Sequence, residues 1–527
     1  MRDPRAFRWD APDSDAPAGS SRVWTFGSGA VIFLAAVLRL VALALKPMHH
    51  DEGVNGFFLT NLVRHGRYVY DPTNYHGPTL YYFALPTAWL FGLNEEAVRI
   101  VPALCGVATV VLVLCLRRHL GTLGALAAAA LVAVSPGAVY QSRYFIHESL
   151  FVLFALGIVV AAVWYYDTGR ARYLMLAAAS AALMFATKET AIITAVVLLL
   201  AWGVAWGYMR LAGSLSWAER RRDDDAGDGA ASRIPLDDPA RFVILFGGAV
   251  IVFLVINILL YSSLFKNPKG ITDAVAALQV WTKTGVSEFH AKPFHTYLKW
   301  SGQEELPLFL LAVCGSAAAL YRARNRFAVF AGAWAFGTLA AYSLVPYKTP
   351  WLMLNFTVPM ALAAGYGISE LDAWAARSGF KRKAAVGAVL GFALLVALVQ
   401  AVILNFREYD NDRYPYVYSH TKRDIFPLLE EIERAAERAG TGEDTHIAVA
   451  APEYWPLPWY LNHYRNVGFH GRPGAYTDTV VIGSAKEPEA TQLRAQLGPA
   501  YRRAGAVYTL RPGVDLVLYV RNDVRGR

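Results

Sequence analysis

Long apolar segments separated by short polar connections occupy residues 23–405. Most are roughly 20 residues long, about the length that an α-helix needs to cross a bilayer. Charged residues, prolines and glycines interrupt the apolar pattern and set the ends of each segment. We predict eleven membrane helices, at residues 23–45, 97–116, 121–140, 149–166, 171–187, 190–208, 241–262, 305–321, 327–344, 351–371 and 383–405. The pattern indicates a polytopic α-helical membrane protein.

The segment 78–92 is apolar and rich in aromatic residues, but it is shorter than the others. We expect it to lie at the membrane interface, because a crossing would move every later connection to the opposite side. With the N-terminal tail (residues 1–22) in the cytoplasm, every cytoplasmic connection carries Arg or Lys, including the long one at 209–240. This agrees with the positive-inside rule. The long loop 46–96 then lies outside.

From residue 406 to residue 527 the composition changes to that of a soluble domain. Residues 424–439 carry Ile and Leu on one face and charges on the other, which predicts an amphipathic helix. Short apolar runs predict strands at 446–450, 479–482, 506–510 and 514–520. We therefore expect a membrane bundle followed by a small α/β domain outside the membrane. The domain has no Gly-rich phosphate loop and no nucleophile elbow.

Composition supports this interpretation. Of 527 residues, 55% are hydrophobic and only 17% are charged, which excludes an ordinary soluble protein. The net charge of +9 does not indicate nucleic-acid binding, because the basic residues fall between apolar segments instead of along one polar face. We expect membrane lipids, and no nucleic acid, around the chain. Cys105, Cys115 and Cys314 all lie in apolar segments, so no disulfide framework is predicted.

Ionisable residues gather at the connections that we place outside the membrane. Charges at this depth in a helical bundle usually face an interior cavity. The candidates are His49, His50, Asp51, Glu52, Arg143, His147, Glu148, Lys188, Glu189 and Lys348. The alternative is local ion pairing, of Lys188 with Glu189 or of Arg143 with Glu148.

Transfer of a group from a lipid-linked phosphate suits such a cavity. A phosphate leaving group needs cations, which Lys188, Arg143 and Lys348 can supply. The acceptor hydroxyl must lose its proton as it attacks, and a carboxylate within reach can take it. We choose Asp51 as this base, at the mouth of the first membrane helix, with Glu52 as the second choice. An N-cap role for Asp51, in a helix starting near Gly53, remains an alternative.

Several sequence blocks resemble known proteins. The Asp51-Glu52 pair is followed by Tyr75-His76-Gly77-Pro78-Thr79-Leu80-Tyr81-Tyr82 and then by Ala97-Val98-Arg99-Ile100-Val101-Pro102. This order resembles the C-type (GT-C) membrane glycosyltransferases, nearest the protein-mannosyltransferase-like group, glycosyltransferase family 39. Residues 140–148, Ala186-Thr187-Lys188-Glu189 and Lys348-Thr349-Pro350-Trp351 further resemble the prokaryotic flippase-activity-associated proteins. The resemblance extends over about residues 24–405.

The resemblance implies an inverting sugar transfer from a polyprenyl-phosphate sugar to a glycan or protein acceptor outside the cell membrane, with no required cofactor. It implies that Asp51 is the base and that Lys188 faces the lipid phosphate. Glu148 matches a second acidic position, where relatives more often have Asp, so its role stays open. The rival function is a flippase-accessory or transport protein for lipid-linked glycans, without chemistry of its own. Gathering of the carboxylates on one side, with no evident inverted repeat, favours the enzyme.

Other candidates keep two interpretations. His49 and His50 depart from the mannosyltransferase pattern, and a divalent metal bound by them with Asp51 and Glu52 is an alternative, although metal ligands normally come from more than one stretch of chain. Tyr75, His76, Tyr81 and Tyr82 either bind substrate or belong to an interfacial aromatic belt. The aromatic segment 454–460 either contacts carbohydrate or docks on the bundle or the membrane.

Overall fold

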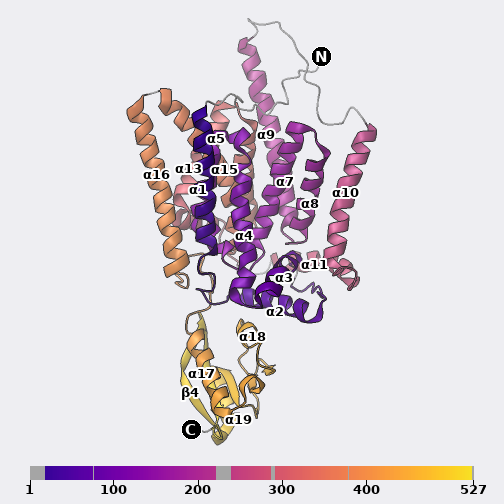
Figure 1. Cartoon of the computed structure of the whole chain (residues 1–527), viewed down its shortest axis with the longest axis vertical. Helices are drawn as coiled ribbons and strands as arrows, with labels where there is room; N and C mark the ends of the chain where they lie inside the picture. The colour runs from indigo at the N-terminus through magenta and orange to yellow at the C-terminus, as the bar shows by residue number, and fades with distance from the viewer. Residues whose placement is uncertain (1–17, 75, 221–238, 286–290, 378, 525–527) are drawn as a thin grey trace.

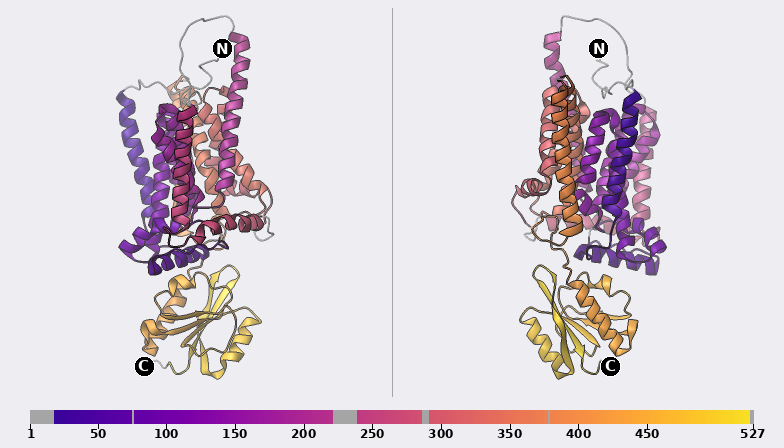
Figure 2. Two further views of the ribbon diagram at one scale, coloured as in Figure 1. Left: turned by 90° about the vertical axis from the view of Figure 1, so that its right-hand side faces the viewer. Right: turned by 60° about the vertical axis from the view of Figure 1, so that its left-hand side comes forward.

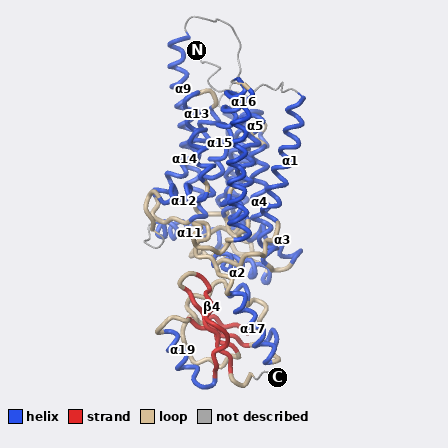
Figure 3. The backbone as a smooth tube through the Cα atoms, turned by 90° about the vertical axis from the view of Figure 1, so that its left-hand side faces the viewer, coloured by secondary structure: helices blue, strands red, loops and turns tan. Residues whose placement is uncertain are grey.

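The computed structural model describes residues 18–524 except 75, 221–238, 286–290 and 378. A long bundle of helices carries a smaller domain at one end (Figure 1). The strands lie in that smaller domain, and helices build the bundle (Figure 3). The predicted fold class, a helical membrane bundle with a small α/β domain, is confirmed.

Each of the eleven predicted membrane segments corresponds to a helix. Among the described residues, 8 helices are long and apolar enough to cross a membrane, or up to 10 if each of two bent pairs is one span. The eight are α1 (Ala18–Leu40), α4 (Glu95–Leu114), α7 (Glu148–Thr168), α9 (Ala191–Arg220), α10 (Pro239–Tyr261), α14 (Arg326–Leu344), α15 (Leu354–Arg377, with the 3-10 turn before it) and α16 (Phe380–Val402). The bent pairs are α5 (Arg117–Val134) with α6 (Pro136–Ser142), and α12 (Thr296–Glu304) with α13 (Leu306–Arg322). The shorter apolar helix α8 (Ala171–Phe185) accounts for the remaining segment.

Helix α15 lies in the middle of the bundle because small residues let its neighbours approach closely. A Cβ on Gly124 of α5 would lie 2.8 Å from the carbonyl oxygen of Gly365 in α15. A Cβ on Gly315 of α13 would lie 2.0 Å from the carbonyl oxygen of Ala363. Small residues at such crossings are typical of helix packing in membranes. Helices α1, α10 and α16 lie at the edges of the bundle instead (Figures 1 and 2).

The end of the bundle that faces the sheet domain carries α2 (His50–His65), α3 (Thr79–Phe91) and α11 (Lys269–Gly285) (Figure 1). Helix α3 coincides with the segment predicted to be interfacial. Its 13 residues are too few to cross the hydrocarbon core, which takes about 20.

The smaller domain contains a five-stranded sheet of order β2-β1-β3-β5-β4. The strands are β1 (His446–Val449), β2 (Asn466–Phe469), β3 (Val480–Ser484), β4 (Tyr501–Arg511) and β5 (Val514–Arg521). Strand β1 pairs in parallel with β2 and β3, whereas β5 is antiparallel to β3 and β4. The predicted helix at 424–439 is α17 (Ile425–Ala439), and the four predicted strands are β1, β3, β4 and β5. Strand β2 and the helix α19 (Glu489–Leu497) are additional.

Alternation along the strands gives the sheet two apolar faces. Ile447 and Val449 of β1 pack in one cluster with Ile425 and Leu428 of α17. The intervening Ala448 packs on the other face with α19. Helices therefore cover both faces of the sheet, α17 on one and α19 on the other, which makes this domain a three-layer unit.

The domain rests on α2 through a short aromatic helix, α18 (Leu457–Tyr460). A Cβ on Gly56 of α2 would lie 2.4 Å from Cε3 of Trp459, so glycine makes room for the indole. The Trp459 Nε1–H donates to Glu95 Oε1 at 2.9 Å, and Tyr460 Oη accepts from the Met48 amide at 2.8 Å. Trp459 and Tyr460 thus dock on the bundle, as one of the two interpretations of segment 454–460 predicts.

Candidate active site

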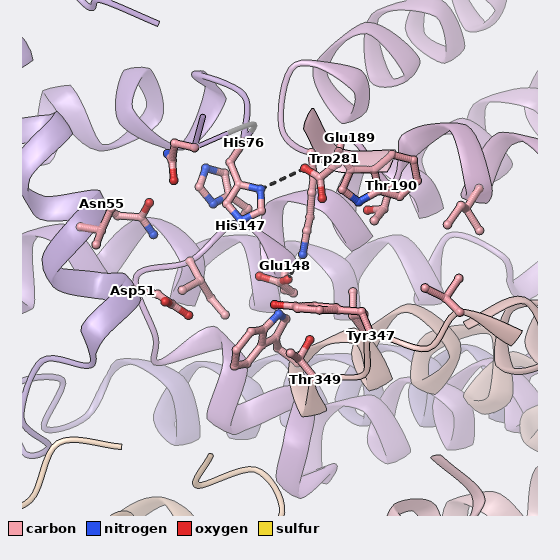
Figure 4. A pocket seen from close by; sticks show the side chains of 18 of the residues that line it. Asp51, Asn55, His76, His147, Glu148, Glu189, Thr190, Trp281, Tyr347 and Thr349 are labelled. Atoms are coloured by element: carbon pink, nitrogen blue, oxygen red, sulfur yellow. Dashed lines mark hydrogen bonds and ion pairs between the residues drawn. The ribbon is translucent and has the colours of Figure 1, made fainter. Parts of the chain in front are cut away.

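A cavity of about 310 Å³ opens at the end of the bundle that carries the sheet domain. Its wall is built from α2 and from the connections that precede α3, α7, α9 and α15. The ionisable side chains that line it are His50, Asp51, His76, His147, Glu148, Lys188 and Glu189. Figure 4 shows the labelled members of this set around one space. Residues far apart in the sequence therefore meet in a single polar cavity.

The start of α2 places Asp51 at the cavity. His49 is the N-cap: its Nδ1 accepts from the Asp51 amide at 3.0 Å. Burial lowers the pKa of His49, and in the neutral ring the Nε2–H is then the donor toward the Tyr418 carbonyl at 3.0 Å. Because His49 caps the helix, the Asp51 carboxylate is not the cap, and the N-cap alternative for Asp51 is wrong. The Asp51 side chain is 40% exposed and does not cap the helix.

Glu52, the second choice as base, lies behind the cavity wall with its side chain 0% exposed. Its two carboxylate oxygens accept from Arg99 Nε and Arg99 Nη2, both at 2.7 Å. They also accept from the Phe145 amide at 2.7 Å and the His49 amide at 3.0 Å. Burial alone would raise the pKa of Glu52, but Arg99 lowers it below its usual value. Glu52 therefore links α2 to α4 and to the loop before α7 inside the protein, and its buried carboxylate cannot reach a substrate in the cavity.

Lys188 is held in the cavity by carboxylates. Its Nζ donates to Glu148 Oε1 at 2.5 Å, and both side chains are almost fully buried. Burial would lower the pKa of Lys188, but Glu148 and Glu189 outweigh it and raise the pKa. The ammonium is therefore charged. It has three donors, of which Glu148 accepts one.

Glu189 pairs with a histidine and not with its neighbour Lys188. Its Oε2 lies 3.0 Å from Nδ1 of His76, the contact drawn in Figure 4. Burial would raise the pKa of Glu189, but His76 and Lys188 lower it. The rings of His76 and His147 lie 4.8 Å apart between centroids. These imidazoles form the part of the wall next to Lys188.

The His76-Gly77-Pro78-Thr79 motif docks on the turn that bears Lys188. The amides of Gly77 and Thr79 donate to the carbonyls of Thr187 and Ala186, each at 3.1 Å. A Cβ on Gly77 would lie 2.0 Å from the Ala186 carbonyl oxygen, so only glycine allows this approach. The contact explains how two blocks separated by about a hundred residues form one edge of the cavity.

Several predicted site residues lie elsewhere. The guanidinium of Arg143 donates to the carbonyls of Val41 and Ala42, at 2.6 and 2.7 Å, beyond the end of α1. The Lys348 Nζ donates to the Val345 carbonyl at 2.6 Å, although its neighbours Tyr347 and Thr349 do line the cavity. Both cations are buried in backbone contacts and outside the cavity wall.

The tyrosines of the predicted motif also have structural contacts. Tyr81 donates to Asn55 Oδ1 at 3.0 Å, and Tyr82 donates to Ser263 Oγ at 2.8 Å. Neither residue lines the cavity. Tyr75 lies outside the described residues.

A metal at His49, His50 and Asp51 finds little ligand capacity. Both ring nitrogens of His49 are engaged in hydrogen bonds, and the His50 Nδ1 lies 3.0 Å from Arg511 Nη1. Within the described ranges, no group of three or more His, Cys, Asp or Glu side chains is placed to hold a metal ion. The imidazoles instead serve helix capping and the contact with the sheet domain.

Some site residues were not singled out by the sequence. Arg99 was noted only as part of a resembling block, although a guanidinium inside an apolar segment needs a buried partner, either an acid or backbone carbonyls. Asn55 donates to the Phe145 carbonyl at 2.9 Å and lines the cavity with Trp281, Tyr347, Thr349 and Trp351. These polar and aromatic residues carry no charge, so charge patterning alone does not find them.

The fold and this cavity define a multi-pass membrane protein built around a polar site at the helix ends. Residues 75–216 match the family model "Dolichyl-phosphate-mannose-protein mannosyltransferase". No curated protein sequence matches the chain significantly.

Solved structures share the fold at low sequence identity. ArnT from Cupriavidus metallidurans in the apo state has a TM-score of 0.62 and 14% identity, over 96% of this chain and 100% of that chain. The same protein bound to undecaprenyl phosphate has a TM-score of 0.55 and 15% identity, over 97% and 100% of the two chains. The Archaeoglobus fulgidus oligosaccharyltransferase tethered with an acceptor peptide has a TM-score of 0.52 and 14% identity, over 84% of this chain and 63% of that one.

These comparisons confirm the predicted resemblance to GT-C and mannosyltransferase-like proteins, whereas the resemblance to flippase-activity-associated proteins stays a prediction. The chain has the fold of the GT-C membrane glycosyltransferases, and its residues 75–216 resemble the mannosyltransferase-like group among them. The matched range includes the His76 motif, Glu148 and Lys188, which contribute to the cavity wall.

Proposed function

We propose that the protein transfers a sugar, with inversion, from a polyprenyl-phosphate donor to a hydroxyl acceptor on a glycan or protein. The observation that supports this most directly is the cavity itself, which gathers the half-exposed carboxylate of Asp51 and the charged ammonium of Lys188. A base and a cation in one site are what an attacking hydroxyl and a departing phosphate require. The similarity of the fold to a protein solved with undecaprenyl phosphate supports a polyprenyl carrier.

The reaction is a single displacement. The acceptor oxygen attacks the anomeric carbon as the bond from that carbon to the phosphate oxygen breaks. The Asp51 carboxylate takes the acceptor proton, and the lipid phosphate leaves carrying the bonding electrons. Lys188 stabilises the charge that develops on this phosphate. Glu148 keeps Lys188 charged and in place, which assigns it a positioning role.

The site lies on the extracytoplasmic side in this proposal, with the N-terminus in the cytoplasm. The basic connections at the opposite end of the bundle support that orientation. The domain of residues 406–527 is then extracytoplasmic, next to the cavity mouth. We propose no resident cofactor, since the described residues offer base and cation directly.

Replacement of Asp51 by Asn tests the proposal. The variant keeps the size and the helix cap, which His49 supplies, so it should fold normally. We expect transfer to fall by about 10²- to 10⁴-fold, the usual contribution of a positioned base. The assay reconstitutes the purified protein in liposomes and follows the release of polyprenyl phosphate from radiolabelled polyprenyl-phosphate sugars.

The matched control is Glu430→Gln on the exposed surface of α17, which should leave the rate unchanged. An Asp51→Asn protein that transfers sugar at the normal rate would remove the proposed role. A flippase-accessory protein without chemistry would release no polyprenyl phosphate in any variant, so the assay also separates the rival function.

A further inference from the structure

A second cavity, which we call the aromatic groove, lies between α2 and the sheet domain. Its volume is about 430 Å³, within the range of about 300–1,000 Å³ that ligand sites occupy. Helix α2 contributes one wall and the sheet domain contributes the other. The residues that define it here are Phe57, Asn61, Tyr454, Trp455, Asn462 and Phe469.

Four rings follow one another along the groove. The centroid of Phe57 lies 6.2 Å from Trp455, Trp455 lies 5.9 Å from Tyr454, and Tyr454 lies 5.1 Å from Phe469. Phe57 is 48% exposed, and the other rings are half-buried. Trp459, four residues after Trp455, also lines the groove but is buried in the docking contact. The docking of the two units therefore leaves part of each of these four rings exposed.

Polar groups accompany the rings. The amides of Asn61 and Asn462 lie in the same groove, and each amide both donates and accepts hydrogen bonds. Arg64 Nη2 donates to the Asn462 carbonyl at 2.9 Å, which fixes this part of the domain to α2. The other arginine of the groove, Arg465, forms an ion pair with Asp444, and its Nη1 lies 3.1 Å from Asp444 Oδ1.

This combination fits a saccharide. The C–H faces of a sugar ring carry partial positive charge and pack on the negative faces of aromatic rings, and its hydroxyls match amide groups that donate and accept. A lipid chain would leave the amides without partners.

The groove adjoins the active-site cavity. The ring of Trp455, in the groove, lies 6.3 Å from the ring of His50, which lines the cavity. Arg511 Nη1 lies 3.0 Å from both His50 Nδ1 and the Trp455 carbonyl oxygen. His50 precedes Asp51, so a chain lying in the groove would have its end beside the proposed base.

We propose that the aromatic groove binds a neutral oligosaccharide, which is the acceptor glycan of the transfer reaction. That this saccharide is the acceptor rests on the proposed function. That a saccharide binds in the groove is independent of the proposed function, because binding depends only on the rings and amides.

The test measures saccharide binding to the full-length protein in nanodiscs free of glycosidic detergent, by isothermal titration calorimetry. The probes are mannotetraose, maltotetraose and N-acetylchitotetraose, with a proline-rich decapeptide as the competing class. We expect at least one saccharide to bind. Trp455→Ala should weaken it by about tenfold, the loss of one good aromatic contact, and Trp455→Phe should restore most of the affinity.

The controls separate the groove from the cavity. Phe426→Ala removes a ring that is 38% exposed on α17 and should leave binding unchanged. If Asp51→Asn still transfers sugar, the proposed function fails while the groove assignment stands. Absence of binding to every saccharide, equal affinity in Trp455→Ala, or binding of the peptide alone would overturn the groove assignment.

Discussion

The buried ion pair between Glu52 and Arg99 yields a prediction about stability. Both side chains are 0% exposed, and two contacts of 2.7 Å join them. In Glu52→Gln the Arg99 guanidinium stays buried without a counter-charge. Removing one partner of such a pair costs about 3–5 kcal/mol. An exposed pair such as Glu430 with Arg434 contributes about 0.5 kcal/mol, so Glu430→Gln is the matched control.

The assay is equilibrium unfolding in mixed micelles with increasing SDS, which gives the free energy of unfolding for each variant. Arg99→Met should be similarly destabilised, because it leaves the Glu52 carboxylate buried alone. The double variant should lose less than the sum of the two, since neither charge remains. Per folded molecule, Glu52→Gln should transfer sugar at a near-normal rate, unlike Asp51→Asn.

Two results would refute this reasoning. One is a loss below about 1 kcal/mol in Glu52→Gln, which would place the pair among solvent-screened contacts. The other is additivity of the two single variants, which would mean that the charges do not interact. Loss of transfer in folded Glu52→Gln would return Glu52 to the list of candidate bases.

Two further predictions concern the edge of the cavity that holds Lys188. Gly77→Ala places a Cβ 2.0 Å from the Ala186 carbonyl oxygen. In the same SDS titration it should lower the free energy of unfolding by about 1–3 kcal/mol. The control is Gly29→Ala, because nothing lies within 4 Å of a Cβ at that position. The pKa of Glu189 is held below its usual 4.5, so its contribution to stability is present above that pH and is lost as pH falls through the folded value. At pH 7 the free energy of unfolding of Glu189→Gln should therefore be lower than that of the unchanged protein. Between pH 7 and a pH below about 5 it should fall by less than in the unchanged protein. An equal fall in both proteins would contradict the pairing of Glu189 with His76.

The sequence predicts the bundle well because length and apolarity are local properties. A helix is present at each of the eleven predicted segments, although α5 and α13 belong to bent pairs and α8 is shorter than a full span. The bends depend on packing, which the hydrophobic pattern does not record. Strand β2 was missed because its four residues, Asn466–Phe469, carry little apolar signal.

The candidate site is predictable only in part. The charges at the helix ends identify Asp51, Glu148 and Lys188 as members of one region, and the structure gathers them. The charge pattern does not show which of the adjacent residues Asp51 and Glu52 faces the cavity. Neighbours on a helix point about 100° apart, and only the presence of Arg99 behind α2 decides which is buried. Arg143 was misplaced for the same reason, since its partners are backbone carbonyls of a distant segment.

The hydrogen bond from Arg511 to His50 has a consequence for biosynthesis. Arg511 ends β4, and a ribosome reaches it more than four hundred and fifty residues after His50. The wall beside Asp51 is thus completed by a domain that is synthesised after the helices of the bundle. A nascent protein with its helices already inserted would still lack this contact, so the cavity wall beside Asp51 is complete only after the sheet domain has folded.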